Sequence, residues 1–142
     1  MATTAQYVAQ PIVEIYSVAS TDTSRSAPTT TTTLCSGPAV AAADGKGKRI
    51  LRVIVNEVNA IGAGTANVIR FWISVDGGTT KRLYCERAVP AITSSSTAVG
   101  FRTEISELVG LVLPAASSNA PTLYMSSHSA ATYHVVIESG TL

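Results

Sequence analysis

Apolar and polar residues alternate along much of this chain, in short segments separated by Gly, Pro, Asn and Ser. Alternation with a period of two gives a strand one apolar and one polar face, and branched residues such as Val and Ile favour extended backbone. The segments with this pattern are residues 12–18, 49–58, 68–75, 81–89, 98–105, 108–113, 122–127 and 133–138. The sequence therefore predicts about eight strands.

Turn residues between these segments predict how some of them pair. Asp76-Gly77-Gly78 separates two strands by a tight turn, so we predict a hairpin between 68–75 and 81–89. We also expect 122–127 and 133–138 to pair as a terminal hairpin, and a short helical turn within 103–110. Regularly spaced short strands without an amphipathic helix predict an all-β fold, an antiparallel and jelly-roll-like β-sandwich.

The first 33 residues differ from the rest, since they are rich in Ser, Thr and Ala and end in five threonines at 29–33. We interpret 1–33 as an extended N-terminal arm with one strand, and 34–142 as the sandwich domain. The arm can add a strand to a neighbouring subunit, and its interface residues would then be Ile12, Val13, Ile15 and Tyr16. In that case deletion of 1–26 would leave the sandwich folded and abolish assembly. An ordinary edge strand and loop of the same domain explains the pattern equally well.

The composition favours a protein that is covered by other subunits. Of the 142 residues, 46% are apolar and only 13% are charged, which is about half the usual share for soluble domains. No apolar run approaches the roughly 20 residues of a membrane span, and the start of the chain lacks the pattern of a secretory signal. A net charge of +1 makes nucleic acid and anionic membranes unfavoured partners. We therefore expect an assembly component, present as a homo-oligomer and made in the cytoplasm.

Two groups of residues suggest chemistry without completing it. Cys35 and Cys85 fit neither a disulfide framework nor a zinc site, and we expect buried free thiols. The glycines of Gly62-Ala63-Gly64 precede a strand, whereas a dinucleotide site requires them to follow one. The stretch 45–48 lacks the Ser or Thr that a phosphate-binding loop places after its lysine. We expect both glycine-containing stretches to be loops.

The titratable residues also do not form a recognisable site. His134 and Glu138 can share one face of a strand, but two ligands do not hold a metal ion. A nucleophilic Cys85 with His134 as its base is conceivable without a local motif to support it. We expect Glu104 and Glu107 to be surface residues, and most of the aromatic residues (Phe71, Trp72, Tyr84, Tyr124 and Tyr133) to pack in the core. The sequence thus predicts no catalytic, cofactor-binding or metal site and no enzyme.

From Arg49 to Leu142 the chain resembles the small β-sandwich structural proteins of tailed bacteriophage virions. The resemblance lies in the order of its pieces, which are Arg49-Ile50-Leu51-Arg52-Val53, Val68-Ile69-Arg70-Phe71-Trp72-Ile73-Ser74, Leu83-Tyr84-Cys85-Glu86 followed by Val89-Pro90, Leu113-Pro114-Ala115, and Glu138-Ser139-Gly140. It implies a capsid decoration or cement protein of the virion, which binds the major capsid protein or other virion subunits and stabilises the shell. The alternative is a tail or fibre module that binds host carbohydrate, and an enzyme is third.

Overall fold

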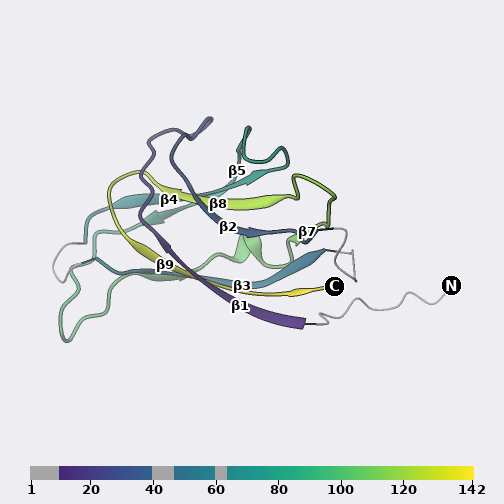
Figure 1. The fold of residues 1–142 in the computed structure, drawn as a ribbon. Helices are drawn as coiled ribbons and strands as arrows, with labels where there is room; N and C mark the ends of the chain where they lie inside the picture. The colour runs from purple at the N-terminus through teal and green to yellow at the C-terminus, as the bar shows by residue number, and fades with distance from the viewer. Residues whose placement is uncertain (1–9, 40–46, 60–63) are drawn as a thin grey trace.

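The structure is a computed structural model that describes residues 10–39, 47–59 and 64–142. Its nine strands in these ranges form two antiparallel sheets packed face to face, so the predicted all-β sandwich is confirmed (Figure 1). One sheet has the order β1-β9-β3-β6, with β7 also paired to β3, and the other has the order β2-β8-β4-β5. The bounds are β1 Gln10–Val18, β2 Thr32–Ser36, β3 Lys48–Glu57, β4 Asn67–Ser74, β5 Arg82–Val89, β6 Arg102–Glu104, β7 Val112–Leu113, β8 Thr122–Ser127 and β9 Tyr133–Thr141.

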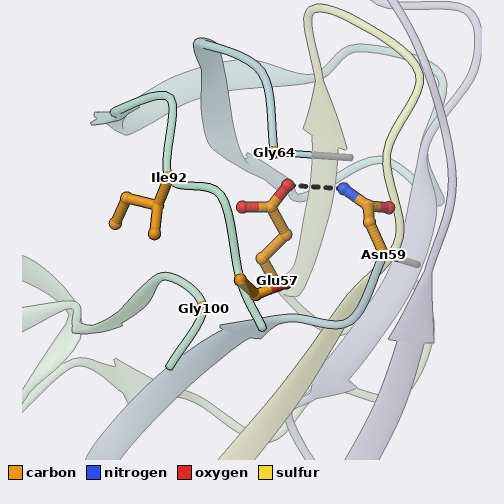
Figure 2. A pocket seen from close by; sticks show the side chains of 6 residues that line it. Glu57, Asn59, Gly64, Ile92 and Gly100 are labelled. Carbon is orange, nitrogen blue, oxygen red and sulfur yellow. Dashed lines mark hydrogen bonds between the residues drawn. The ribbon is translucent and has the colours of Figure 1, made fainter. Parts of the chain in front are cut away.

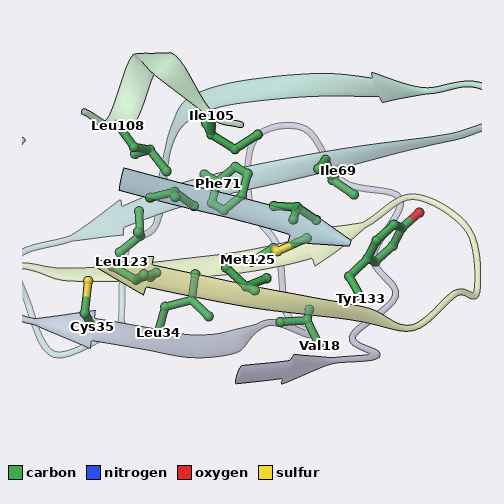
Figure 3. Close-up of a cluster of buried hydrophobic side chains, with 14 of the residues drawn as sticks. Val18, Leu34, Cys35, Ile69, Phe71, Ile105, Leu108, Leu123, Met125 and Tyr133 are labelled. Atoms are coloured by element: carbon green, nitrogen blue, oxygen red, sulfur yellow. The ribbon is translucent and has the colours of Figure 1, made fainter. Parts of the chain in front are cut away.

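The hydrophobic core lies between the two sheets and follows the alternation of the sequence. Val53 and Val55 of β3 are fully buried, and the same holds for alternate residues of β9 and β4. Ile69, Phe71, Leu123 and Met125 of the four-stranded sheet meet them from the other side, and Figure 3 shows Tyr133 closing one end of this cluster. Each strand thus gives the core one of its two faces.

The predicted hairpin of β4 and β5 is confirmed, and its turn is organised by one carboxylate. Asp76 Oδ1 accepts hydrogen bonds from the backbone N–H of Thr80 at 2.8 Å and from Ser74 Oγ at 2.7 Å. These two hydrogen bonds, with the Thr80 backbone contributing most, lower the pKa of Asp76 to about 2. Gly77 and Gly78 both have positive φ, which glycine adopts without strain.

The predicted terminal hairpin is wrong. β8 lies in the four-stranded sheet, whereas β9 lies in the five-stranded sheet between β1 and β3. The connection therefore crosses from one sheet to the other, and the buried side chain of Asn67 holds it there. Asn67 Nδ2 donates to Ser129 O and to Tyr133 Oη, both at 3.0 Å, and its Oδ1 accepts from Ser129 N at 2.8 Å. The short loop was compatible with either arrangement, and these contacts with a distant strand decide between them.

Two further segments differ in detail from the expectation. Residues 98–113 form two short strands, β6 and β7, around a single 3₁₀ turn at Ser106–Leu108, which lies where a helical turn was predicted. No strand was expected at β2, whose first two residues were assigned to the arm and the rest to the sandwich domain. β2 pairs with β8 through an irregular register, and the expected boundary at residues 33 and 34 falls inside it.

Candidate functional site

β1 is the edge strand of the five-stranded sheet of the described chain, and we call its second, unpaired side the open side. It pairs with β9 along its whole length, from Gln10 opposite Thr141 to Val18 opposite Tyr133. Among the described residues, no strand pairs with its second side. Val18 is fully buried in the common core. In this structure residues 10–18 therefore occupy the position that the edge-strand alternative assigned to them.

The four predicted interface residues lie on two different faces of β1. Val13 and Ile15 point away from the sandwich and are 64% and 70% exposed. Ile12 and Tyr16 are half-buried on the inner face, where Tyr16 packs against the core. A strand turns successive side chains to opposite faces, so these four cannot form one surface. Val13 and Ile15 are the two that a partner can reach.

The inner face of β1 is fixed by an ion pair. Lys48 Nζ lies 2.9 Å from Glu14 Oε1, and the hydroxyl of Tyr16 donates to Glu14 Oε2 at 2.6 Å. Burial would raise the pKa of Glu14, but the hydrogen bonds from Tyr16 and Lys48 outweigh it and lower this pKa. Glu14, the single charged residue of β1, thus points inward, and the outer face of the strand carries no charge.

A row of apolar side chains runs from Ile15 across the outer face of the five-stranded sheet. Ile15 is opposite Val136 of β9, and Val136 is opposite Ile54 of β3. Directly opposite residues share a face, so these three side chains lie side by side outside the sandwich. We call Ile15, Val136 and Ile54 the apolar row. Leu51 and Val112 add further exposed apolar surface on β3 and β7, at 42% and 40% exposure.

Charged and polar residues, together with Val13, flank the apolar row. On one side lies the line Val13, Glu138 and Arg52, and on the other lies Ser17, His134 and Asn56. Arg52 forms an ion pair with Glu104 of β6. An apolar centre with a polar rim is the usual composition of a protein interface.

Part of the outer face of the other sheet is covered by the chain itself. Arg70 and Trp72 point to this side of β4, yet they are only 4% and 0% exposed. Residues 19–31, which connect β1 to β2, lie against it: Arg70 Nη1 donates to Asp22 O at 3.5 Å, and Arg25 pairs with Glu86 at 2.7 Å. In Figure 1 this connection rises beyond the layer of β4 and β8. The two outer faces are therefore unequal, and the apolar row lies on the one without this cover.

Asp22 organises the covering segment. Its carboxylate accepts hydrogen bonds from the backbone N–H groups of Ser24 at 2.8 Å, Thr29 at 2.7 Å and Thr30 at 2.8 Å. Burial would raise the pKa of Asp22, but these backbone hydrogen bonds outweigh it and lower this pKa. A short polar side chain that bonds successive backbone groups gives a loop a defined shape. The threonine run thus begins as a structured loop.

The structure does not bring the candidate nucleophile and base together. Cys85 packs against the core from the inner face of β5, whereas His134 is exposed on the outer face of β9 in the other sheet. Both cysteines are described and both are free thiols; Cys35 is buried as predicted, whereas Cys85 is only half-buried. Burial raises the pKa of each thiol to about 11, so both are protonated and weakly nucleophilic at neutral pH.

The remaining titratable candidates are also separated. His128 lies beside Arg70, with 3.4 Å between His128 Nδ1 and Arg70 Nη1, on the face away from His134. Glu104 and Glu107 bind different arginines, Arg52 and Arg87. Within the described ranges, no three His, Cys, Asp or Glu residues are grouped to hold a metal ion.

The pocket in Figure 2 is too small for a ligand. It encloses about 10 Å³ and is lined by Glu57, Asn59, Gly64, Ile92, Ser94 and Gly100. Glu57 Oε1 accepts a hydrogen bond from Asn59 Nδ2 at 2.5 Å, and Asn59 Oδ1 accepts one from Thr132 N at 2.9 Å. This volume holds one water molecule at most. The hydrogen bonds of Glu57 and Asn59 therefore connect the end of β3 to the loop before β9.

Gly64 serves this close packing. A Cβ at this position would lie 1.6 Å from the carbonyl oxygen of Ile92, so a larger residue does not fit. Gly62 and Ala63, which complete the glycine stretch, lie outside the described residues, as do Asp44, Gly45 and Lys46 of the other stretch.

A second, shallower groove of about 240 Å³ lies beside the β4–β5 hairpin, lined by Ile73, Val75, Asp76, Thr80 and Arg82. No aromatic side chain lines it. Of the five aromatic residues singled out above, Phe71, Trp72, Tyr124 and Tyr133 are buried, and Tyr84 is 43% exposed. The stacking platform of a sugar site is therefore lacking at this groove.

The apolar row and the open side of β1 are the features that sequence reasoning did not assemble. A signal was present, because Val53-Ile54-Val55 and Val135-Val136-Ile137 are uninterrupted apolar triplets in strands that otherwise alternate. The middle residue of each triplet must face away from the core. The 3₁₀ turn is the only helical element of the described chain, which contains no helix long enough to cross a membrane. Comparison of the sequence with known protein families and with curated proteins finds no match.

Proposed function

We propose that this chain is a non-enzymatic structural protein of a phage virion, a capsid decoration protein that binds neighbouring capsid subunits and stabilises the shell. The observation that carries the proposal is the inequality of the two outer faces. One is partly covered by residues 19–31, and the other carries the apolar row beside charged residues. Apolar surface with a polar surround marks an interaction site.

The strand order supports the jelly-roll-like sandwich that the spacing of the strands predicts. Without the two-residue β7, the eight strands follow the order first, eighth, third, sixth in one sheet and second, seventh, fourth, fifth in the other. Two interleaved Greek keys produce this order, and viral capsid domains use it widely. Fold alone does not assign a function, so the proposal depends on the exposed face.

The proposed contact uses the five-stranded sheet. The apolar row would be buried against a capsid subunit, and the charges of Arg52, Glu104 and Glu138 would surround it. Charges at the rim fix orientation more than affinity. The low overall charge of the chain agrees with a protein partner and not with nucleic acid.

The test is the substitution Val136→Lys, which places a charge in the middle of the apolar row, on the outer face of β9. We expect this variant to fold but to sediment with purified shells of the phage at least about tenfold more weakly, because an unpaired charge would be buried in the contact. The matched control is Val99→Lys, since Val99 is 88% exposed and lies in the loop before β6. Equal binding of both variants, or failure of the unmodified protein to bind shells, would refute the proposed function.

A further inference from the structure

We propose that β1 pairs with β1 of a second copy of this chain, antiparallel and about a two-fold axis that passes beside Ile15. This inference deepens the proposed function and rests on it only for its biological purpose, since it names the partner at the open edge. Three features indicate a second copy as the partner, namely the length of the edge, the uncharged outward residues of β1 and the complementarity of one register.

β1 is the edge where pairing is least opposed. It is nine residues long, and alternate residues direct their backbone N–H and C=O groups to the open side. Natural sheets protect such edges with charges, prolines, short strands or bulges. The outward residues of β1 are Pro11, Val13, Ile15 and Ser17, none of which is charged, and its one proline lies at the second residue of the strand, outside residues 12–18.

The other edges carry the protection that β1 lacks. β5 contains Arg82, Glu86 and Arg87, and β6 is only three residues long with a charge at each end. β2 has five residues, and its register with β8 is broken by an irregularity. β1 is therefore the preferred site for addition of a strand.

Self-pairing restricts the register strongly. Opposite residues of an antiparallel pair share a face, so outward residues must meet outward residues, and the axis must pass beside a residue rather than between two. An axis at Glu14 would pair all nine residues, but it would set Glu14 directly against Glu14 of the second copy, and opposed like charges destabilise a sheet. An axis at Val13 would place Glu14 opposite Ile12 of the second copy, and an axis at Tyr16 would place it opposite Val18. Both arrangements set a charged side chain against an apolar one.

An axis at Ile15 removes these conflicts. Residue i then pairs with residue 30 − i, which covers 12–18 of both strands. Glu14 then lies opposite Tyr16 of the second copy, and Tyr16 lies opposite Glu14 of that copy. These two residue types are compatible neighbours, since the hydroxyl of Tyr16 already donates a hydrogen bond to Glu14 at 2.6 Å within one copy. Ile15 lies opposite Ile15, so the strand's most exposed apolar side chain is covered by its own equivalent.

The same register makes the apolar row continuous. Ile54, Val136 and Ile15 of one copy are followed by Ile15, Val136 and Ile54 of the other, so the two five-stranded sheets become one sheet of ten strands. A self-complementary contact of this kind closes on itself and gives a symmetric dimer. A row of six apolar side chains then faces outward, in a surface twice as wide as one copy presents.

Cysteine cross-linking tests the pairing and its register in the full-length chain with Cys85→Ala. Ile15→Cys should form a disulfide dimer by itself, because each Ile15 faces its equivalent across the axis. Val13→Cys and Ser17→Cys should each stay monomeric on a non-reducing gel, since residues 13 of the two copies are offset by four positions, about 13 Å, beyond disulfide reach. A mixture of these two variants should cross-link.

Two results would overturn the inference. Cross-linking of a mixture of Val13→Cys with Ile15→Cys, but not of Ile15→Cys alone, would place the axis at Glu14 and refute the register. Absence of cross-links in every combination, with a monomer in sedimentation, would refute self-pairing.

A charge variant separates this inference from the proposed function. Ile15→Lys should raise the dimer dissociation constant at least about tenfold, since two charges would face each other across the axis, whereas Val99→Lys should leave it unchanged. A dimer that ignores shells would refute the shell-binding proposal alone. If the unmodified protein is a monomer that binds shells, and Ile15→Cys cross-links to the capsid subunit, only the dimer is refuted. The partner at the open side of β1 would then be the capsid subunit.

Discussion

At the scale of single residues, most polar side chains that the fold buries have a structural partner. Lys48 is only 9% exposed, and Glu14 and Tyr16 complete its surroundings in the inner face of the first strand. Buried charges remain ionised in proteins only when they are paired and hydrogen-bonded. The charge of β1 is thus stabilised inside the sandwich, which leaves the outer face of the strand apolar.

Glu14→Gln should destabilise the protein by about 1–2 kcal/mol, between the values for exposed and buried ion pairs, because Lys48 loses its counter-charge. Urea unfolding at neutral pH measures this change. The double variant Glu14→Gln/Lys48→Met should recover part of the loss, because no charge is then left unpaired. A single variant as stable as the unmodified protein would show that the pair contributes nothing.

The pH dependence of the same pair has a definite sign. The pKa of Glu14 is lowered from its ordinary value of 4.5 in the folded chain, so its contribution to stability is complete above about pH 4.5 and is lost as the pH falls through the lower folded value. The difference in unfolding free energy between the unmodified protein and Glu14→Gln should therefore shrink on acidification in this range. A difference that stays constant down to pH 3 would contradict the assignment.

At the scale of elements, pairing was predictable only where a turn fixed it locally. Asp76 and the two glycines after it set the β4–β5 hairpin, and this pairing was predicted correctly. The connection of β8 to β9 has no such signal, and Asn67 directs it across the sandwich. A strand segment fixes its own period but not its partner, since neighbouring strands come from distant parts of the chain.

Asn67→Ala should cost about 2–3 kcal/mol of unfolding free energy, because the buried hydroxyl of Tyr133 loses its donor and the half-buried carbonyl of Ser129 keeps only the hydrogen bond from Ser127 Oγ. The control is Asn56→Ala on the outer face of β3, for which we expect a change below about 0.5 kcal/mol. Comparable effects of the two substitutions in urea unfolding would mean that the crossover does not depend on Asn67.

At the scale of the whole molecule, the first strand belongs to the same core as the rest. Val18 is fully buried beside residues of both sheets, and β1 pairs with β9 over nine residues. Deleting residues 1–26 would remove these contacts and expose the long edge of β9. Deletion should therefore lower the stability of the sandwich. If residues 1–33 were an independent arm, the truncated chain would instead remain as stable as the full-length protein.

We expect the truncated chain to melt more than about 5 °C below the full-length protein, because the loss of a buried strand exceeds about 1 kcal/mol. Addition of a synthetic peptide of residues 10–18 should raise the melting temperature again by refilling the edge. An unchanged melting temperature of the truncated chain would refute the integral role of β1 and return these residues to a separate arm.

The sequence by itself determined the fold class, because alternation of apolar and branched residues is a local property that each strand carries. It placed β3, β4, β5 and β8 to within one or two residues, and it marked Val13 and Ile15 as sharing a face. It could not decide that one edge of β1 has no partner strand among the described residues, nor that residues 19–31 lie against Arg70 on one outer face while Ile15 is exposed on the other. Those outcomes depend on which strands become neighbours and where a distant loop lies, and only the packing of the two sheets decides them.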